Sequence, residues 1–327
     1  MKAPLHATPG AAEQALRRLE WTVLRRLDGL LQGDYRTLLR GTGLDLADLR
    51  PYQLHDDVRH IDWNVTARLQ QPHVRVHTEE RNMSAWFLLD LSASMDFGSG
   101  RRRKREQLAD FVAVLARVLT RHGNRVGALL YDQRLHTVLP AAGGRRHVLQ
   151  LLDLLQRHAA TPRPPAGAGL TRLQDLLAAA GGMVRRRSTL FVLSDFLSAP
   201  GWSGALAQLA QRHEVVAVRL YDPLEQTLPD LGLLPLRDPE TGATLLVDTG
   251  DAALRARYAR LAAQRAQAVH TQIARAGVDA MELASDENLL AALLRLTALR
   301  RQRLRGPRAR LPAHLHPVPA PAVEAAA

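Results

Sequence analysis

The amino-acid sequence predicts an α/β fold in which a mostly parallel β-sheet carries helices on both faces. From residue 84 onward, apolar strand-like stretches alternate with helix-like stretches. The strand-like stretches, such as AWFLLD at 85–90 and STLFVLSD at 188–195, are runs of apolar residues that end in an acid. Such runs are typical of parallel strands that are buried on both faces, and the helices between them predict crossover connections. The 327 residues suffice for one large domain or two modest ones.

Each predicted element follows from its periodicity or from its turn residues. Helices are expected where apolar residues recur at helical spacing, at 11–32, 103–122, 146–158, 170–182, 204–213, 251–276 and 285–302. Strands are expected at 73–77, 85–90, 125–132, 135–140, 188–195, 214–222, 243–249 and 279–283. Gly33 and Gly277 are expected to end the helices that precede them, and Ser285 to cap the last helix. The Pro- and Ala-rich tail at 305–327 is expected to be disordered.

The amino-acid composition excludes several kinds of site and of cellular location. The chain has no cysteine, which excludes disulfides, thiol catalysis and Cys-based metal sites. Its start lacks the apolar core of a signal peptide, and no stretch approaches the roughly 18 apolar residues of a membrane span. We therefore expect a cytoplasmic protein. The formal charge of +12 suggests nucleic acid as a partner. However, the basic clusters at 101–105, 185–187 and 300–310 contain no interleaved aromatic residues, so nucleic-acid binding is not favoured.

Acids and hydroxyls follow two of the predicted strands. Asp90, Ser92 and Ser94 lie at and just past the end of one strand, Asp195 ends a second, and Thr171 precedes a helix. In parallel sheets, ligands gather at the carboxyl ends of the strands. Carboxylates and hydroxyls are hard oxygen ligands that suit Mg²⁺ or Mn²⁺. These five residues are therefore the predicted metal ligands, although a Ser-rich loop after a strand is often only a turn and a helix cap.

Such a metal site predicts binding rather than catalysis. Two carboxylates balance the charge of the ion, and neutral hydroxyls leave it electrophilic, so a carboxylate of a protein partner can take an open position. A phospho-aspartate enzyme has a second acid two residues after its nucleophile, where this chain has Ser92. Neither a phosphate-binding loop nor a G-x-S-x-G motif occurs. We expect no enzymatic activity. A metal-dependent hydrolase using Asp90 and Asp195 stays open as an alternative, as does a nucleic-acid-associated protein.

The D-x-S-x-S motif and its strand resemble the metal-ion-dependent adhesion site of von Willebrand factor A domains, over roughly 80–300. The preceding run RPYQLHDDVRHIDW is similar to R-x-Y-x-x-G-D-D-V-R-x-I-D-W of the bacterial domain of unknown function 58 family. Two positions depart from that family's pattern. His55 replaces its glycine, and the hydroxyl loop reads Thr171-Arg172-Leu173 in place of T-D-L.

The resemblance implies a von Willebrand factor A-like (Rossmann-like) domain at 80–304, after an N-terminal helix and family-specific extended segment at 1–79 and before a disordered tail at 305–327. It also implies a companion or adaptor of a MoxR-type AAA ATPase, with that ATPase as the protein partner that presents the acidic residue.

The charged run HDDVRHIDW has two interpretations. The favoured one is a buried ion-pair lock that joins the N-terminal segment to the A-like domain, because Arg forks hold irregular backbone well on carboxylates. The alternative is a partner-binding surface. The residues concerned are Asp56, Asp57, Arg59, Asp62, Trp63 and Arg68. The nearby histidines 55, 60, 73 and 77 match no zinc signature.

Overall fold

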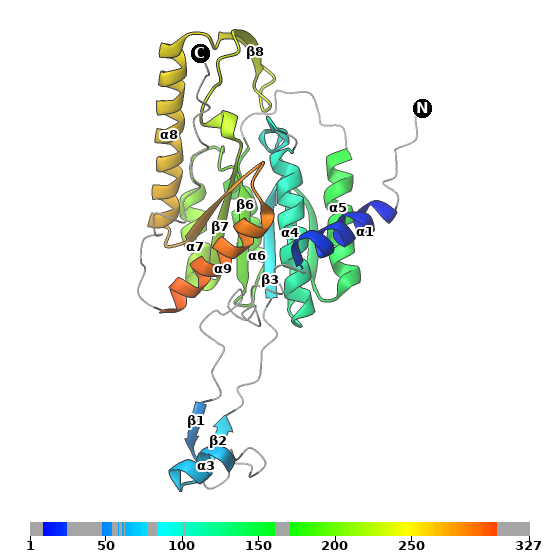
Figure 1. Cartoon of the computed structure of the whole chain (residues 1–327), viewed down its shortest axis with the longest axis vertical. Helices are drawn as coiled ribbons and strands as arrows, with labels where there is room; N and C mark the ends of the chain where they lie inside the picture. Colours follow the sequence, from blue (N-terminus) through cyan, green and yellow to red (C-terminus); the bar gives the residue numbers. More distant parts are fainter. Residues whose placement is uncertain are drawn as a thin grey trace.

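A six-stranded sheet forms the centre of the protein in the computed structural model (Figure 1). The structure describes residues 9–24, 48–53, 58, 61, 63–76, 84–100, 102–160 and 171–305. The strand order is β10-β7-β6-β3-β4-β5, and all neighbours are parallel except β5, which runs antiparallel to β4 at one edge. The strands are β3 (Ser84–Asp90), β4 (Arg125–Tyr131), β5 (Leu135–Ala142), β6 (Thr189–Ser194), β7 (Glu214–Tyr221) and β10 (Asp279–Ala284). The predicted α/β class with a mostly parallel sheet is confirmed.

The central strand β3 explains why the strands read as apolar runs. Successive side chains of a strand point to opposite faces. Phe87 and Leu89 lie in the core on one side of the sheet, whereas Leu88 lies in the core on the other side. Both faces are covered, so both sets of side chains are buried. Leu89 pairs with Leu193 of β6, which makes the two strands end at the same level.

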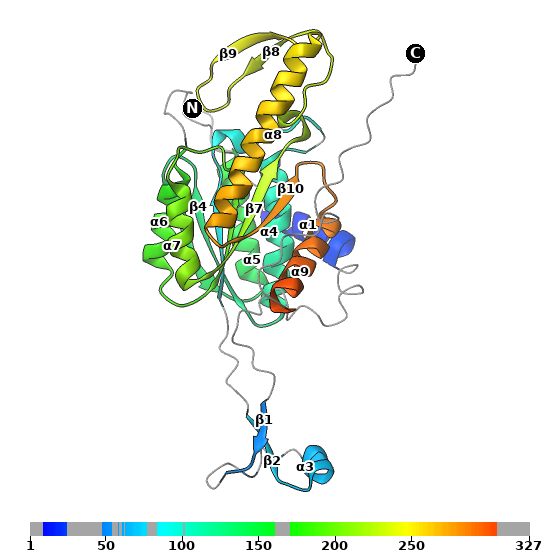
Figure 2. The ribbon, with the colours of Figure 1, turned by 90° about the vertical axis from the view of Figure 1, so that its left-hand side faces the viewer.

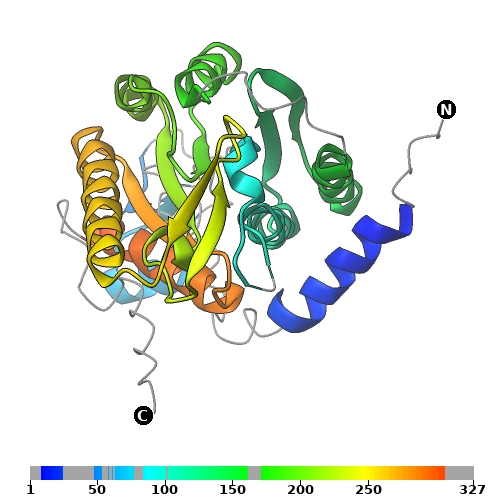
Figure 3. The same ribbon diagram turned by 90° about the horizontal axis from the view of Figure 1, so that it is seen from above.

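Helices cover the two faces in separate layers (Figure 3). One face carries α4 (Lys104–Arg121), α5 (Arg145–Ala160) and α9 (Leu289–Arg305), with α1 (Pro9–Leu19) against α4 and α5. The other face carries α6 (Leu173–Met183), α7 (Trp202–Arg212) and α8 (Ala252–Arg275). These elements agree with the predicted helices to within a few residues. None of the helices in the described ranges combines the length and the apolar composition that crossing a membrane requires.

A β-hairpin projects at the end of the sheet where the strands finish (Figure 2). It consists of β8 (Leu233–Arg237) and β9 (Thr244–Asp248), which pair antiparallel. The sequence predicted only the second strand, because LLPLR contains a proline and lacks clear alternation. The hairpin lies between η5 (Pro223–Glu225) and α8 in the chain.

The N-terminal part contains a second small sheet. After α1, a short π-helical turn, η1, covers Glu20–Leu24. Strands β1 (Asp48–Pro51) and β2 (His73–Val76) pair antiparallel, and α3 (Trp63–Leu69) lies between them in the chain. The rest of the predicted helix at 11–32, Gly33, the predicted boundary at 79–80 and the tail beyond 305 fall outside the described residues.

Two expectations about this region and the last helix are corrected. Trp63 is 70% exposed and Arg68 is exposed too, so a buried lock is wrong at these positions. Asp56, Asp57, Arg59 and Asp62 lie outside the described residues, as do histidines 55, 60 and 77. Ser285 does not cap α9. Asn288 does, since its Oδ1 accepts hydrogen bonds from two backbone N–H groups of the first turn. Gly277 ends α8 as predicted, with a left-handed φ of 71°.

Candidate metal centre

The five predicted ligands gather at the carboxyl edge of the sheet. Asp90 is the last residue of β3, and Asp195 directly follows its neighbour β6. Ser92 and Ser94 lie in the loop and 3-10 turn η4 (Ala93–Asp96) that follow β3, and Thr171 lies just before α6. All five are at most 3% exposed. Parallel pairing of β3 with β6 therefore places two carboxylates and three hydroxyls in one buried region.

Asp90 is held by hydrogen bonds to both oxygens. The backbone N–H of Ser92 donates to its Oδ1 at 3.0 Å, and the hydroxyl of Ser194 donates to its Oδ2 at 2.6 Å. The Oγ atoms of Ser92 and Ser94 lie 3.1 Å apart, so the two alternate hydroxyls converge. Ser194, the last residue of β6, was not predicted as part of the site. The sequence signal for it is its place beside Asp195 at the end of an apolar strand.

The buried environment of Asp90 disfavours ionisation of its carboxyl group. Burial, together with the charge of nearby Asp195, raises the pKa of Asp90 to about 6, although the hydrogen bonds from Ser194 and Ser92 oppose the shift. Among the described residues, no cationic side chain forms an ion pair with Asp90. A cation beside this carboxylate would favour its ionised form and so oppose the rise in its pKa.

Asp195 has a cationic partner that the sequence did not predict. The Nζ of Lys104, at the start of α4, lies 2.8 Å from Oδ2 of Asp195 and 2.6 Å from Oε1 of Glu225. The Lys104 side chain is fully buried. Burial lowers the pKa of Lys104, but the two carboxylates outweigh it and raise the pKa overall. A usable signal exists in the sequence, because Lys2 and Lys104 are the only lysines in this arginine-rich chain.

The loop after Asp195 is strained and firmly packed. Phe196 adopts a left-handed φ of 58°, which is rare for a bulky residue. Its ring packs against Trp202 with centroids 5.0 Å apart, and its N–H donates to Oγ of Ser194. The next N–H, of Leu197, donates to Oδ1 of Asp195 at 2.9 Å. Strain of this kind persists where the surroundings over-determine it, and it is concentrated at functional sites.

The Thr171 loop is fixed to the same region. The hydroxyl of Ser198 donates to the carbonyl of Thr171 at 2.8 Å and accepts the N–H of Leu173 at 2.8 Å. Thr171 itself is 1% exposed, whereas the side chain of Arg172 is 66% exposed. The arginine that departs from the family pattern therefore points away from the buried hydroxyl.

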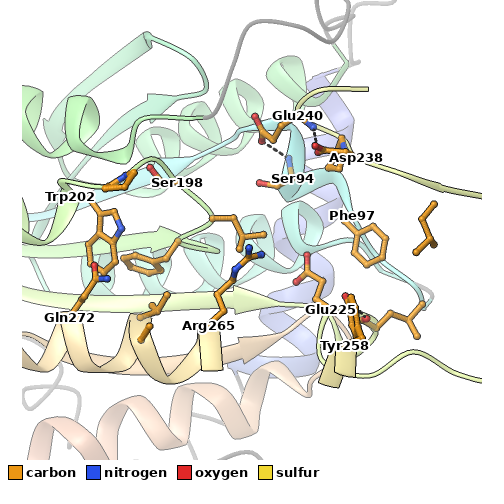
Figure 4. Close-up of a pocket in the computed structure, with 18 of the residues that line it drawn as sticks. Ser94, Phe97, Ser198, Trp202, Glu225, Asp238, Glu240, Tyr258, Arg265 and Gln272 are labelled. Atoms are coloured by element: carbon orange, nitrogen blue, oxygen red, sulfur yellow. Dashed lines mark hydrogen bonds between the residues drawn. The ribbon is translucent and has the colours of Figure 1, made fainter. Parts of the chain in front are cut away.

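A third carboxylate reaches the site from the hairpin. Glu240, between β8 and β9, accepts the backbone N–H of Ser94 on Oε1 at 3.0 Å (Figure 4). Its Oε2 accepts the hydroxyl of Thr171 at 3.1 Å. It joins segments that are far apart in the chain, and sequence reasoning gave no indication of it. Beside Glu240, a cavity of about 1150 Å³ extends between the hairpin, α7 and α8, and is lined by apolar side chains and by arginines such as Arg265.

Asp222 is another acid at a strand end, and it was not among the predicted site residues although the predicted strand at 214–222 ends in VRLYD. It is fully buried and accepts the hydroxyls of Ser99 and Ser285 at 2.5 and 2.6 Å. The N–H groups of Ser99 and Leu224 also donate to it. Burial raises its pKa, but these hydrogen bonds outweigh burial and lower the pKa overall. Asp222 therefore ties three loops together, and its carboxylate oxygens already accept hydrogen bonds from donors of this chain.

The donor set decides which ion could fit. Within the described part of the chain, no three His, Cys, Asp or Glu side chains cluster closely enough to hold a metal by themselves. Hydroxyl and water oxygens would have to complete any coordination sphere around Asp90. Oxygen-only donors that leave room for water suit Mg²⁺ or Mn²⁺. The buried Asp90 carboxylate and the converging hydroxyls are compatible with such an ion.

The strand order, the crossover helices and the hydroxyl-rich loop after β3 define an α/β protein of the von Willebrand factor A type. The chain belongs to the family described as "Protein of unknown function DUF58", whose model matches residues 48–268. It is 38% identical over 291 residues to the uncharacterized protein Rv1480 of Mycobacterium tuberculosis, covering 88% of this chain and 89% of the relative. The uncharacterized protein Mb1516 of Mycobacterium bovis matches over the same shares with the same identity.

Solved structures resemble the chain more distantly. The conserved hypothetical protein BatB from Bacteroides thetaiotaomicron matches with a TM-score of 0.43 and 14% identity, covering 68% of this chain and all of BatB. A von Willebrand factor type A protein from Catenulispora acidiphila matches with a TM-score of 0.30 and 12% identity, covering 43% of this chain and 33% of that protein. The fold class is established by the strand order and connections of this chain itself.

Proposed function

We propose that this protein is a non-enzymatic, divalent-metal-dependent binding module that recognises an acidic residue of a protein partner. The observation that carries the proposal is the arrangement of Ser94 and Thr171, whose N–H and hydroxyl both donate to one carboxylate. This position lies beside the buried acids and hydroxyls at the end of β3. The same edge of the sheet can therefore offer a metal and receive a carboxylate.

The charges of the surrounding side chains favour a divalent cation at the metal site. The hydrogen-bonded network contains four carboxylates, from Asp90, Asp195, Glu225 and Glu240, and one ammonium, from Lys104. With all of them ionised, the network carries a net charge of −3, which one divalent cation would reduce to −1. Ser92, Ser94 and Thr171 would supply neutral oxygens, with Asp90 and Asp195 near the ion. When bound, Mg²⁺ or Mn²⁺ would act as a Lewis acid that accepts a carboxylate oxygen.

Burial of the acids supports binding rather than hydrolysis. Asp90 and Asp195 are at most 2% exposed, and each accepts a backbone N–H two residues later in the chain. A carboxylate held in this way is oriented as a ligand and is poorly placed to attack a substrate. Phosphatase and esterase assays with Mg²⁺ test this part, and a turnover that Asp90→Asn abolishes would favour the hydrolase alternative.

The basic surface favours an acidic protein over nucleic acid. In the cluster at 101–105, Arg102 pairs with Asp110, Lys104 is buried, and Arg105 pairs with Asp96 at 3.1 Å. These three cations form ion pairs within the protein. The remaining positive charge would attract an acidic partner over long range, and salt should weaken this attraction. A MoxR-type AAA ATPase that presents an Asp or Glu is the partner we propose.

Metal binding is tested first on the protein alone. We expect Mg²⁺ or Mn²⁺ to raise the melting temperature relative to EDTA, since a site saturated at about 100 times its Kd adds about 2.7 kcal/mol. Ser92→Ala combined with Ser94→Ala should remove most of this gain. Ser203→Ala, in a partly buried serine of α7, is the matched control. An equal metal-dependent gain in the double variant would exclude these serines as ligands.

Partner binding is tested by pull-down with a candidate MoxR-type ATPase. The complex should form with Mg²⁺, dissociate with EDTA, and fail with the double serine variant. Charge reversal of the essential acid in the ATPase should weaken binding more than its amide does. Binding that tolerates both the chelator and the serine changes would rule out the metal site as the contact.

A further inference from the structure

The β8–β9 hairpin contributes almost nothing to the hydrophobic core. Leu233, Leu245 and Leu246 are each more than 60% exposed, and Leu236 is 38% exposed. Side chains of this kind usually hold a hairpin to a protein by burial. Here they face solvent, and the cavity of about 1150 Å³ separates part of the hairpin from α8.

Glu240 is the exception. Across 231–248, every residue of which is described, Glu240 is the one buried residue, with 8% exposure. A glutamate is among the side chains least often buried without a partner. The hairpin therefore inserts a charged group, and none of its leucines, into the body of the protein.

The connection between the strands is built to aim this carboxylate. Oδ1 of Asp238 accepts the N–H of Glu240 at 2.9 Å (Figure 4). Its Oδ2 accepts the hydroxyl of Thr241 at 2.6 Å. The N–H of Gly242 donates to the carbonyl of Asp238, and Gly242 has a left-handed φ of 74°. The turn is thus rigid, and Glu240 projects from it toward the end of β3.

Glu240 meets the two groups that a ligand of the metal site would meet. Its Oε1 lies 3.0 Å from the N of Ser94 and its Oε2 lies 3.1 Å from Oγ1 of Thr171. Ser94 and Thr171 are two of the proposed neutral ligands. A carboxylate that bridges them occupies the mouth of the site, where an acid from outside would enter.

We propose that Glu240 is an internal ligand of the metal site, and that the hairpin must withdraw it before a partner's carboxylate can bind. This inference rests on the proposed function. It makes the partner's acid a competitor of Glu240 for one position. It also explains why one charged side chain holds the tip of the hairpin. The contact that Glu240 makes can be replaced by an equivalent contact from a carboxylate of another protein.

The number of waters on bound Mn²⁺ tests the proposal without a partner. Mn²⁺ is loaded onto the full chain, and the relaxation rate of water protons is measured per bound ion. If Glu240 fills a coordination position, Glu240→Ala should leave that position to water. We then expect a higher relaxation rate in Glu240→Ala and weaker Mn²⁺ binding, since one charged ligand is lost. Added acetate should lower the rate in the variant, because it takes the vacated position, and should leave the parent protein unchanged.

Asp248→Ala is the matched control, since it removes one exposed carboxylate from the same hairpin without touching the site. It should behave like the parent protein. Glu240→Gln is the second variant, in case the alanine disturbs the fold. It should keep the hairpin seated and still weaken Mn²⁺ binding.

The outcomes separate the two proposals. Equal relaxation rates and equal Mn²⁺ affinities in the parent and both Glu240 variants would show that a metal binds and that Glu240 is not its ligand. The proposed function would then stand and the inference would fall. Absence of Mn²⁺ binding in every protein, the parent included, would overturn both.

Discussion

Replacing Lys104 by methionine tests the electrostatic design of the site without any assumption about a metal. Methionine keeps much of the volume of the lysine side chain and removes its charge. The Lys104 side chain is fully buried, Asp195 is 2% exposed and Glu225 is 25% exposed. The change therefore leaves one carboxylate buried without its cation, while Glu225 can turn toward water.

The size of the effect follows from this asymmetry. Breaking a buried ion pair by removing one partner costs about 3–5 kcal/mol. Because Glu225 can regain part of its hydration, we expect the lower end, about 3 kcal/mol. Total stability of a domain is about 5–15 kcal/mol, so the variant should still fold. With an m-value of about 3 kcal/mol per M in urea, the unfolding midpoint should fall by about 1 M.

Urea denaturation in EDTA at pH 7.5, followed by circular dichroism, measures this shift. Arg172→Met is the matched control, because it removes an exposed cation 4.0 Å from Asp175 and should change stability by less than about 0.5 kcal/mol. Lys104→Met combined with Asp195→Asn should recover most of the loss, since the buried position then holds no unpaired charge.

An unchanged midpoint in Lys104→Met would refute the reasoning, because Asp195 would then not depend on the ammonium. A double variant no more stable than the single one would also contradict it, since the cost would then come from packing and not from charge.

Three further predictions concern other positions. The pKa of Asp90 is raised to about 6 in the folded protein, so its protonated form contributes stability below about pH 4, which is lost as the pH rises through 6. In EDTA, the Asp90→Asn variant should therefore be more stable than the parent protein above pH 6. The gain should reach about 3 kcal/mol, at 1.36 kcal/mol per pKa unit, and should nearly vanish at pH 4. A difference between the two urea midpoints that does not change with pH would contradict this. The pKa of Asp222 is lowered, so its contribution is present above the ordinary value of 3.8 and is lost as the pH falls through the lower folded value. Acid unfolding of Asp222→Asn should consequently be less steep than that of the parent, and an identical acid transition would count against the hydrogen-bond set assigned to it. Asn288→Ala should cost about 1 kcal/mol in thermal unfolding as loss of a helix cap, whereas Ser285→Ala should lower stability through Asp222 and leave the helicity of α9 unchanged in circular dichroism.

Local patterns in the sequence were enough for the fold class and for the five candidate ligands. The apolar run of β3 predicts a strand buried on both faces, and Asp90, Ser92 and Ser94 follow it at spacing two. Asp195 follows an equivalent run. These signals lie within one element and its adjoining loop, and parallel pairing of β3 with β6 then brings the two ends together. The helices were predictable for the same reason, since their periodicity is local.

Ser285 shows how local reasoning fails even within one loop. A serine before a helix with acids after it is a good cap by sequence. In the folded protein its hydroxyl donates instead to Asp222 at 2.6 Å, 63 positions away, and Asn288 takes the capping role. A buried carboxylate with unused acceptor capacity attracts a donor more strongly than an exposed helix end does.

The charged partners of the site were decided by tertiary structure alone. Glu240 contacts Ser94 across 146 positions of the chain, and Lys104 contacts Asp195 across 91. Nothing within a few residues of Glu240 distinguishes it from the exposed charges around it, and the only local signal for Lys104 is that it is a lysine among arginines, which names no partner. What selects them is the low-dielectric region at the end of β3, which exists only once the sheet has formed, and in which buried carboxylates require nearby positive charge and hydrogen-bond donors.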